Sequence, residues 1–197
     1  MLISEKKKFV FIHIQKTAGT SLRKYFFENI DDIRDHLRPH SPLMELEEKY
    51  MGFYKTAFVR NPFDRLVSWY FMIKSNSGKK NFLQRNVLEK AHSFSEFVLF
   101  CEEIENASGW KPFKYNQIDY LTDKNGNLAM DFIGKFENLS DDLKVIANQI
   151  NIKKDMLSIP HLNESKHKYY RSYYTEETRR IIEKRFMRDL EYFKYSF

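Results

Sequence analysis

Cysteine is almost absent from this chain, which has only Cys101 among its 197 residues. A single cysteine excludes a disulfide within the chain, so we expect a reducing compartment and a cytoplasmic protein. Long apolar runs are missing as well. The first run, Phe9–Ile14, is too short for the core of a signal peptide. No segment approaches the length that crosses a bilayer, so no transmembrane segment is expected.

The composition is that of a soluble globular protein, with 42% hydrophobic and 30% charged residues. The 18 Phe and 12 Tyr suit a deep core together with clefts that stack flat ligands. The net charge of +6 is unevenly placed, because residues 60–90 carry seven Lys or Arg against two acids, whereas residues 102–143 carry nine acids against four bases. This asymmetry indicates either an anionic ligand near one end of the molecule or a solvated basic face.

Three runs have the pattern of buried strands: Phe9–Ile14, Lys55–Val59 and Leu128–Phe136. Segments with the apolar spacing of helices follow them. Alternating strands and helices predict one α/β domain over residues 1–197, with a mainly parallel central sheet flanked by helices.

Capping and turn residues predict where the other elements begin and end. Thr17 or Thr20 can cap the first helix, and Asn61 can cap the second, with Pro62 as its first residue. The Asn-Gly pair at 125–126 predicts a hairpin. Further helices are expected at Leu43–Tyr50, Ser93–Ile104 and Ser140–Ile150, and a last one begins near Thr175.

The loop Lys16–Ser21 (KTAGTS) joins the first strand to the first helix. A helix N-terminus binds anions through its unpaired N–H groups. Lys16 adds a charge, Thr17, Thr20 and Ser21 add hydroxyl donors, and Gly19 allows close approach of the backbone. The motif G-x-x-x-x-G-K-[ST] of triphosphate-binding loops is not matched, so the seat for a metal is missing. The alternative is a capped turn with a surface lysine.

A second candidate anion site follows the strand Lys55–Val59. Arg60 lies at the carboxyl end of that strand, the edge at which open α/β sheets bind ligands. Arg60 can hold a phosphate bidentately, and Ser68 on the following helix can add a hydroxyl. Arg65 is equally suited to a structural ion pair. Two such sites fit a ligand with two separated phosphate groups.

These segments carry a resemblance. HIQKTAGTSL (13–22) and FVRNPFDRLVSWY (58–70) are similar to the paired motifs of carbohydrate sulfotransferases that use PAPS (3′-phosphoadenosine 5′-phosphosulfate), in particular heparan sulfate 2-O-sulfotransferase and its short bacterial relatives. IGKFENL (133–139) and NESKHKYYRSYYT (163–175) also resemble later segments of that family. Gln15 stands where the family usually has proline, which should alter the rigidity of the loop more than its chemistry. The resemblance implies a sulfotransferase fold related to that of P-loop nucleotide triphosphatases.

The resemblance also implies the roles of the site residues. The 5′-phosphosulfate would bind Lys16, Thr17, Ala18, Gly19, Thr20 and Ser21, and the 3′-phosphate would bind Arg60 and Ser68. A later segment that closes over the nucleotide would add Asn163, Ser165, Lys166 and Arg171. The sulfuryl group would pass from PAPS to a hydroxyl of an acceptor, by analogy a carbohydrate, leaving PAP (3′-phosphoadenosine 5′-phosphate). Lys16 would stabilise the leaving group, and no metal is required.

The transfer needs a general base with a pKa near neutrality. His40 is the first candidate, because it lies in the polar stretch 38–42 that builds no core, near where the related enzymes carry a catalytic histidine. His36 and Glu45 remain alternatives. His13 is better suited to packing or to orienting the loop.

Two other functions compete with this interpretation. A small-molecule kinase would need a magnesium-binding pair and a lysine at another place in the loop. A basic nucleic-acid-binding domain should show a broad basic stripe, whereas the informative basic residues here lie at two strand ends.

Overall fold

The computed structural model describes residues 1–75, 81–107, 109, 111–152 and 168–197. Within these, the chain forms two compact units. The first contains the described residues of 1–60 and 117–164, and the second contains those of 61–116 and 165–197. Each unit is described by itself.

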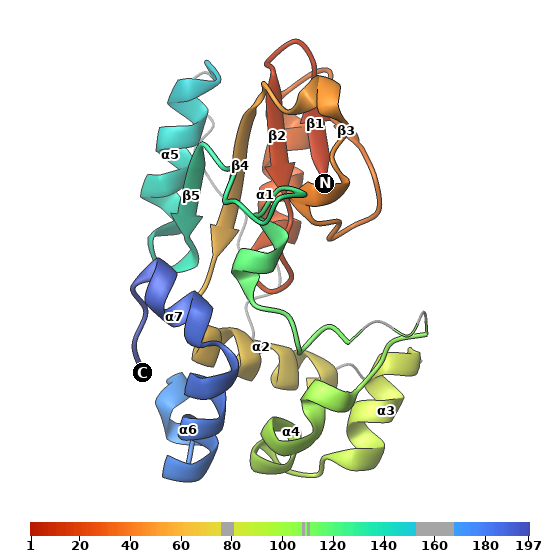
Figure 1. Ribbon diagram of the computed structural model, residues 1–197, viewed down its shortest axis with the longest axis vertical. Coiled ribbons are helices and arrows are strands. Elements are labelled where there is room, and N and C mark those ends of the chain that lie inside the picture. Colours follow the sequence, from red (N-terminus) through yellow and green to blue (C-terminus); the bar gives the residue numbers. More distant parts are fainter. Residues whose placement is uncertain (76–80, 108, 110, 153–167) are drawn as a thin grey trace. The chain divides into compact units, whose positions relative to one another are not determined.

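The first unit is built on a five-stranded sheet of order β3-β1-β2-β4-β5 (Figure 1). Its strands are β1 (Leu2–Ser4), β2 (Phe9–Ile12), β3 (Arg34–Asp35), β4 (Tyr54–Val59) and β5 (Phe132–Lys135). The neighbours β2, β4 and β5 run parallel, whereas β1 is antiparallel to both β2 and β3. The predicted α/β class is confirmed, and the sheet is mixed because β1 and β3 add an antiparallel edge.

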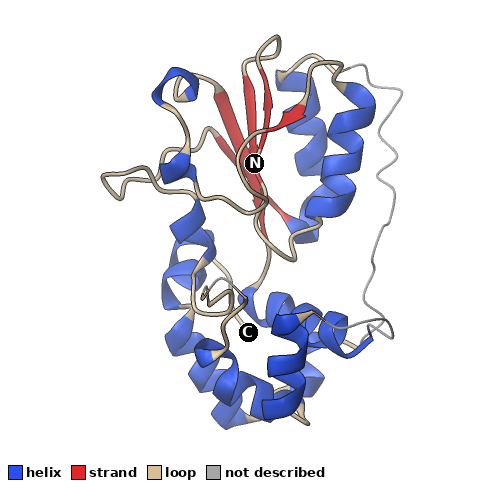
Figure 2. Cartoon of the chain, turned by 90° about the vertical axis from the view of Figure 1, so that its right-hand side faces the viewer, coloured by secondary structure: helices blue, strands red, loops and turns tan. Residues whose placement is uncertain are grey.

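Two helices of the first unit, α1 (Gly19–Asn29) and α5 (Leu139–Gln149), pack against the sheet (Figure 2). Phe9 and Phe11 alternate along β2 and are fully buried, and their ring centroids each lie 5.1 Å from that of Phe26 on α1. Ile146 on α5 and Phe58 on β4 complete the same apolar cluster. Burial of these aromatic and aliphatic side chains stabilises the unit.

The three parallel strands end at one edge of the sheet, since Ile12 pairs with Ala57 and Val59 with Lys135. Gly134 allows β5 to lie this close to β4, because a Cβ at that position would meet the Phe58 ring at 2.5 Å. The segments that follow the strands therefore meet at the carboxyl edge, where α/β sheets bind ligands.

The second unit is helical in its described part. It contains α2 (Pro62–Ser75), α3 (Phe82–Lys90), α4 (Phe94–Phe100), α6 (Glu176–Arg185) and α7 (Met187–Phe193). Capping boxes at Asn81, Ser93 and Thr175 define where α3, α4 and α6 begin. Buried residues such as Phe63, Phe97 and Ile182 form its core. None of the described helices is long and apolar enough to cross a membrane.

Several elements differ from the predictions. Two short 3₁₀ turns, Leu43–Glu45 and Glu48–Tyr50, replace the helix expected at Leu43–Tyr50. The expected C-terminal helix divides into α6 and α7 at Phe186. The predicted hairpin is a turn closed by one antiparallel bridge, Thr122 to Leu128, with Gly126 at φ 80°. These segments are short or polar, so tertiary packing decides their conformation.

Candidate active site

The loop after β2 has a strained backbone. Lys16 and Ala18 both adopt left-handed conformations, with φ angles of 68° and 63°. Such angles cost a non-glycine residue roughly 1–2 kcal/mol. Backbone strain of this kind is typical of ligand-binding loops, and left-handed residues contribute to anion-binding concavities.

The N-terminus of α1 differs from the prediction, because neither Thr17 nor Thr20 caps it. Ala18 is the N-cap residue, and no side chain in the described part of the chain makes a capping hydrogen bond there. The Thr17 hydroxyl is fully buried and donates to the carbonyl oxygen of Ile14 at 2.9 Å. Thr17 therefore fixes the loop, and Thr20 is exposed. The first N–H groups of α1 keep the anion-binding character of a helix N-terminus.

Gly19 is required by its contact with His13. A Cβ at position 19 would lie 1.6 Å from Nε2 of His13. The imidazole thus packs directly on the backbone at the start of α1. Burial of the ring, together with the nearby His40, lowers the pKa of His13 to about 3, so His13 is neutral near pH 7. The prediction that His13 is a packed, loop-orienting residue agrees with this geometry.

Lys16 carries a charge that the site disfavours. Burial of the ammonium group, and to a lesser degree the positive charge of Arg60, together lower the pKa of Lys16 to about 8. An anion placed between the two cations would reverse both effects, because it replaces lost hydration and offsets their repulsion. Lys16 therefore has the electrostatics of a phosphate- or sulfate-binding lysine.

The Arg60 side chain is buried and makes contacts within the first unit. Its guanidinium carbon lies 4.0 Å from the centroid of the Phe136 ring, in a cation–π contact. Its Nη1 donates to the carbonyl oxygen of Lys16 at 3.3 Å. The side chain is only 7% exposed. The structure thus brings the two predicted anion-binding loops of the first unit together at the carboxyl edge of the sheet.

Gln117 is a site residue that sequence reasoning missed. Its side-chain Oε1 accepts from the backbone N–H of Arg60 at 2.9 Å, and its Nε2 donates to the Arg60 carbonyl at 2.8 Å. The Gln117 side chain is fully buried and continues the hydrogen bonding of β4 beyond its end. The sequence offers only a glutamine in the short 3₁₀ turn Gln117–Tyr120, which does not indicate its partner.

His40 lies next to His13. Its Nδ1 is 2.9 Å from the carbonyl oxygen of His13, and the two ring centroids are 4.3 Å apart. A carbonyl oxygen can only accept, so Nδ1 carries the hydrogen in the neutral ring, and the lone pair is on Nε2. This tautomer is the one that a base using Nε2 requires.

The two alternative bases have other partners. Nε2 of His36 lies 3.2 Å from Oε1 of Glu47, and its ring packs edge-on against Tyr50 at 5.1 Å. Burial lowers the pKa of His36. Glu45 pairs with Arg38 at 3.3 Å. His40 contacts His13, the residue whose ring packs on the start of α1.

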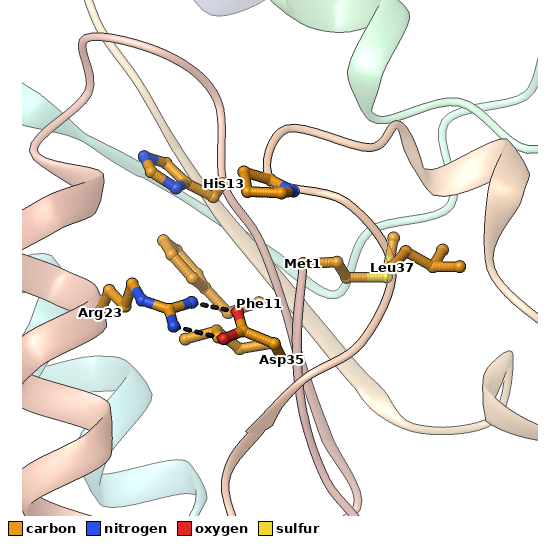
Figure 3. Close-up of a pocket in the computed structure, with 8 residues that line it drawn as sticks. Met1, Phe11, His13, Arg23, Asp35 and Leu37 are labelled. Carbon is orange, nitrogen blue, oxygen red and sulfur yellow. Dashed lines mark hydrogen bonds and ion pairs between the residues drawn. The ribbon is translucent and has the colours of Figure 1, made fainter.

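A cavity of about 510 Å³ opens beside His13 (Figure 3). This volume lies within the usual range for small-molecule sites. Most of its wall is apolar, formed by Met1, Leu2, Phe11, Leu37 and Pro39. Its polar side chains are His13, Arg23 and Asp35, and the last two form a bidentate ion pair that lowers the pKa of Asp35.

The remaining predicted residues belong to the second unit or fall outside the described residues. Ser68 is a buried residue of α2 in the second unit, with 2% exposure. Arg171 belongs to the same unit, is exposed, and donates to the carbonyl oxygen of Phe197 at 2.7 Å while its guanidinium lies near the ring of Tyr169. Asn163, Ser165 and Lys166 lie outside the described residues. No group of three or more His, Cys, Asp or Glu among the described residues could hold a metal ion.

Comparison with known proteins shows the family. The sequence model of the sulfotransferase family matches residues 1–196, which spans both units. The chain therefore belongs to the sulfotransferase family, and the predicted enzyme class is confirmed. A mouse sulfotransferase, SULT7A1, solved in complex with PAP, resembles the fold at 14% identity and a TM-score of 0.46, over 93% of this chain and 83% of that one. No curated protein matches the chain.

Proposed function

We propose that the chain transfers the sulfuryl group of PAPS to a hydroxyl of an acceptor, without a metal ion, as one sulfotransferase domain over residues 1–197. The observation that carries the proposal is the pairing of Lys16 and Arg60. Both cations are largely withdrawn from water at the carboxyl edge of the sheet, and the charge of Arg60 disfavours that of Lys16. A ligand with separated phosphate and phosphosulfate groups relieves this repulsion.

The residues of the first unit fit this ligand. Lys16 and the backbone N–H groups at the start of α1 would hold the 5′-phosphosulfate, and Arg60 would hold the 3′-phosphate. Gln117 would keep the backbone of Arg60 in place. When bound, PAPS supplies the sulfuryl group and an anionic leaving group. Further contacts to the nucleotide are proposed for Ser68, at the 3′-phosphate, and for Arg171, Asn163, Ser165 and Lys166.

The side chains would divide the chemistry between them. Negative charge grows on the leaving phosphate during an in-line displacement, so Lys16 acts most strongly as that charge develops. Nε2 of His40 would take the proton of the acceptor hydroxyl, because its hydrogen bond to the His13 carbonyl fixes the tautomer. Lys16 and His40 are thus the proposed catalytic residues.

The acceptor is proposed to be a carbohydrate hydroxyl. The support is the likeness of HIQKTAGTSL and FVRNPFDRLVSWY to the motifs of heparan sulfate 2-O-sulfotransferase and its short relatives. The proposed compartment is the cytoplasm, because the lone Cys101 is buried and suits a reducing environment.

Ligand-induced thermal shifts distinguish this function from its competitors. The protein is heated alone, with PAP, with ATP and magnesium, and with single-stranded DNA. Stabilisation by PAP in the absence of magnesium supports the proposal, since only a ligand that binds the folded state raises the melting temperature. Stabilisation by ATP with magnesium but not by PAP would instead favour a kinase, and stabilisation by DNA alone would favour a nucleic-acid-binding domain.

A further inference from the structure

Leu37 is an unusual residue for the wall of a cavity. It adopts a left-handed conformation with φ 61°, and its side chain is 39% exposed. Strain of this kind costs a leucine roughly 1–2 kcal/mol, and exposure of an apolar side chain forfeits its burial. Neither feature helps the chain fold. An apolar residue kept in this state indicates a role in binding.

The cavity that Leu37 lines lies next to the proposed base. His13 forms part of its wall (Figure 3). The ring of His13 is 4.3 Å from that of His40. An acceptor whose hydroxyl reaches His40 therefore has this cavity beside His13 available for its adjoining part. Phe11 and Pro39 make this space apolar beyond the imidazoles.

The cavity also has a polar side. Arg23 and Asp35 form their ion pair on its wall, with side chains that are 38% and 54% exposed. A guanidinium–carboxylate pair that reaches solvent can still donate to and accept from hydroxyl groups. The wall therefore matches a molecule with hydroxyls at one end and an apolar group at the other.

We propose that this cavity binds the apolar group of the acceptor, so that the acceptor is an amphipathic compound in which a sugar hydroxyl is joined to an alkyl or acyl chain. The proposal rests on the proposed function and narrows its substrate class from carbohydrates in general to glycosides with an apolar tail. Leu37 and Pro39, which are both exposed on the cavity wall, would contact the tail, and the Arg23–Asp35 pair would contact hydroxyls of the sugar.

The test uses alkyl glucosides from methyl to octyl, each below its micellar concentration. Binding to the PAP-loaded protein is measured by calorimetry, and kcat/KM is measured with PAPS. Burial of the tail predicts an affinity gain of roughly two- to fourfold for each added methylene until the cavity is full. A polysaccharide without an apolar group serves as the comparison acceptor.

Two variants distinguish binding of the tail in the cavity from binding elsewhere on the surface. Leu37→Asn should flatten the dependence on chain length and leave the methyl glucoside unaffected, because asparagine tolerates the left-handed backbone while removing the apolar contact. Val145→Asn is the matched control, since Val145 is also exposed, at 47%, in the same unit but does not line the cavity. Val145→Asn should keep the full dependence of glucoside affinity on chain length.

The outcomes distinguish the two proposals. Binding that is independent of chain length, or a chain-length dependence that Leu37→Asn does not change, overturns the role of the cavity even if sulfate transfer occurs. Chain-length-dependent binding without transfer from PAPS to any acceptor would retain the apolar site and overturn the proposed function instead.

Discussion

Nδ1 of His40 lies 2.9 Å from the carbonyl oxygen of His13, and His13 in turn packs its ring against Gly19 at the start of α1. The candidate base is thus connected to the anion-binding loop through one residue. Because the carbonyl fixes the tautomer, the lone pair of His40 is on Nε2. The arrangement couples the position of the base to the conformation of the loop.

Removing the imidazole of His40 tests its role as base. His40→Ala should lower turnover by ~10²-fold or more, the usual contribution of a general base, while PAP affinity stays close to that of the wild type. Steady-state kinetics and calorimetry measure the two effects. His36→Ala and Glu45→Ala are the controls. Nearly unchanged turnover in His40→Ala, with a loss in either control, would move the role to that residue.

The two cations should differ in what they contribute. Arg60→Ala should weaken PAP binding by about 2–5 kcal/mol, because it removes a charged partner from a desolvated phosphate. Lys16→Ala should reduce kcat more than PAP affinity, since its charge matters most as the leaving group forms. Calorimetry measures the PAP affinity of both variants, and steady-state kinetics measures their kcat. If the two variants show the same pattern, the division of roles is wrong.

The lowered pKa of Lys16 predicts a pH dependence of PAP binding. In the free protein the ammonium loses its proton as pH rises through about 8. A bound anion raises that pKa again, so PAP affinity should be highest below pH 8 and should fall above it, approaching tenfold per pH unit. Calorimetry from pH 7 to 9.5, in buffers of different ionisation enthalpy, should also detect proton uptake.

Lys16→Arg is the control for this titration, because a guanidinium stays charged over the same pH range. Its PAP affinity should be nearly constant from pH 7 to 9.5. An unchanged fall of affinity in Lys16→Arg would assign the titration to another group.

The contact of Gly19 with His13 predicts that Gly19→Ala lowers the free energy of unfolding. Alanine usually stabilises a helix relative to glycine, but Gly19→Ala places its Cβ within 1.6 Å of the His13 ring and should destabilise the protein by roughly 1–3 kcal/mol. In a His13→Ala background the same change should be neutral or stabilising. Denaturant unfolding of the wild type, the two single variants and the double variant gives the interaction energy between the two positions. Additive effects would show that the two positions are not in contact.

The centre of the first unit could be predicted from sequence because β2 and β4 are short runs of mostly apolar residues. β2 falls within the segment expected for it, β4 begins one residue before the expected Lys55, and Arg60 lies at the predicted strand end. β1 and β3 could not be recognised, since Leu2–Ser4 has three residues and Arg34–Asp35 is short and charged. Their place in the sheet depends on pairing with distant residues, which local patterns do not encode.

The charged residues of the candidate site could be identified from the sequence, whereas the hydrogen bonds that hold them in place could not. Lys16 and Arg60 stand out because strand ends place them at a ligand-binding edge. Gln117 is 57 positions from its partner Arg60, so nothing local indicates that pairing. The caps expected at Thr17 and Thr20 were wrong because the loop turns its Thr17 hydroxyl inward to the Ile14 carbonyl.

Transfer of labelled sulfate from PAPS is the measurement that tests the central claim most directly. The protein is incubated with labelled PAPS, without added metal and with a chelator present, against a panel of glycans and alkyl glucosides. The account predicts label on at least one acceptor, formation of PAP in equal amount, and loss of both in Lys16→Ala. No transfer to any acceptor, or transfer that the chelator abolishes, would contradict it.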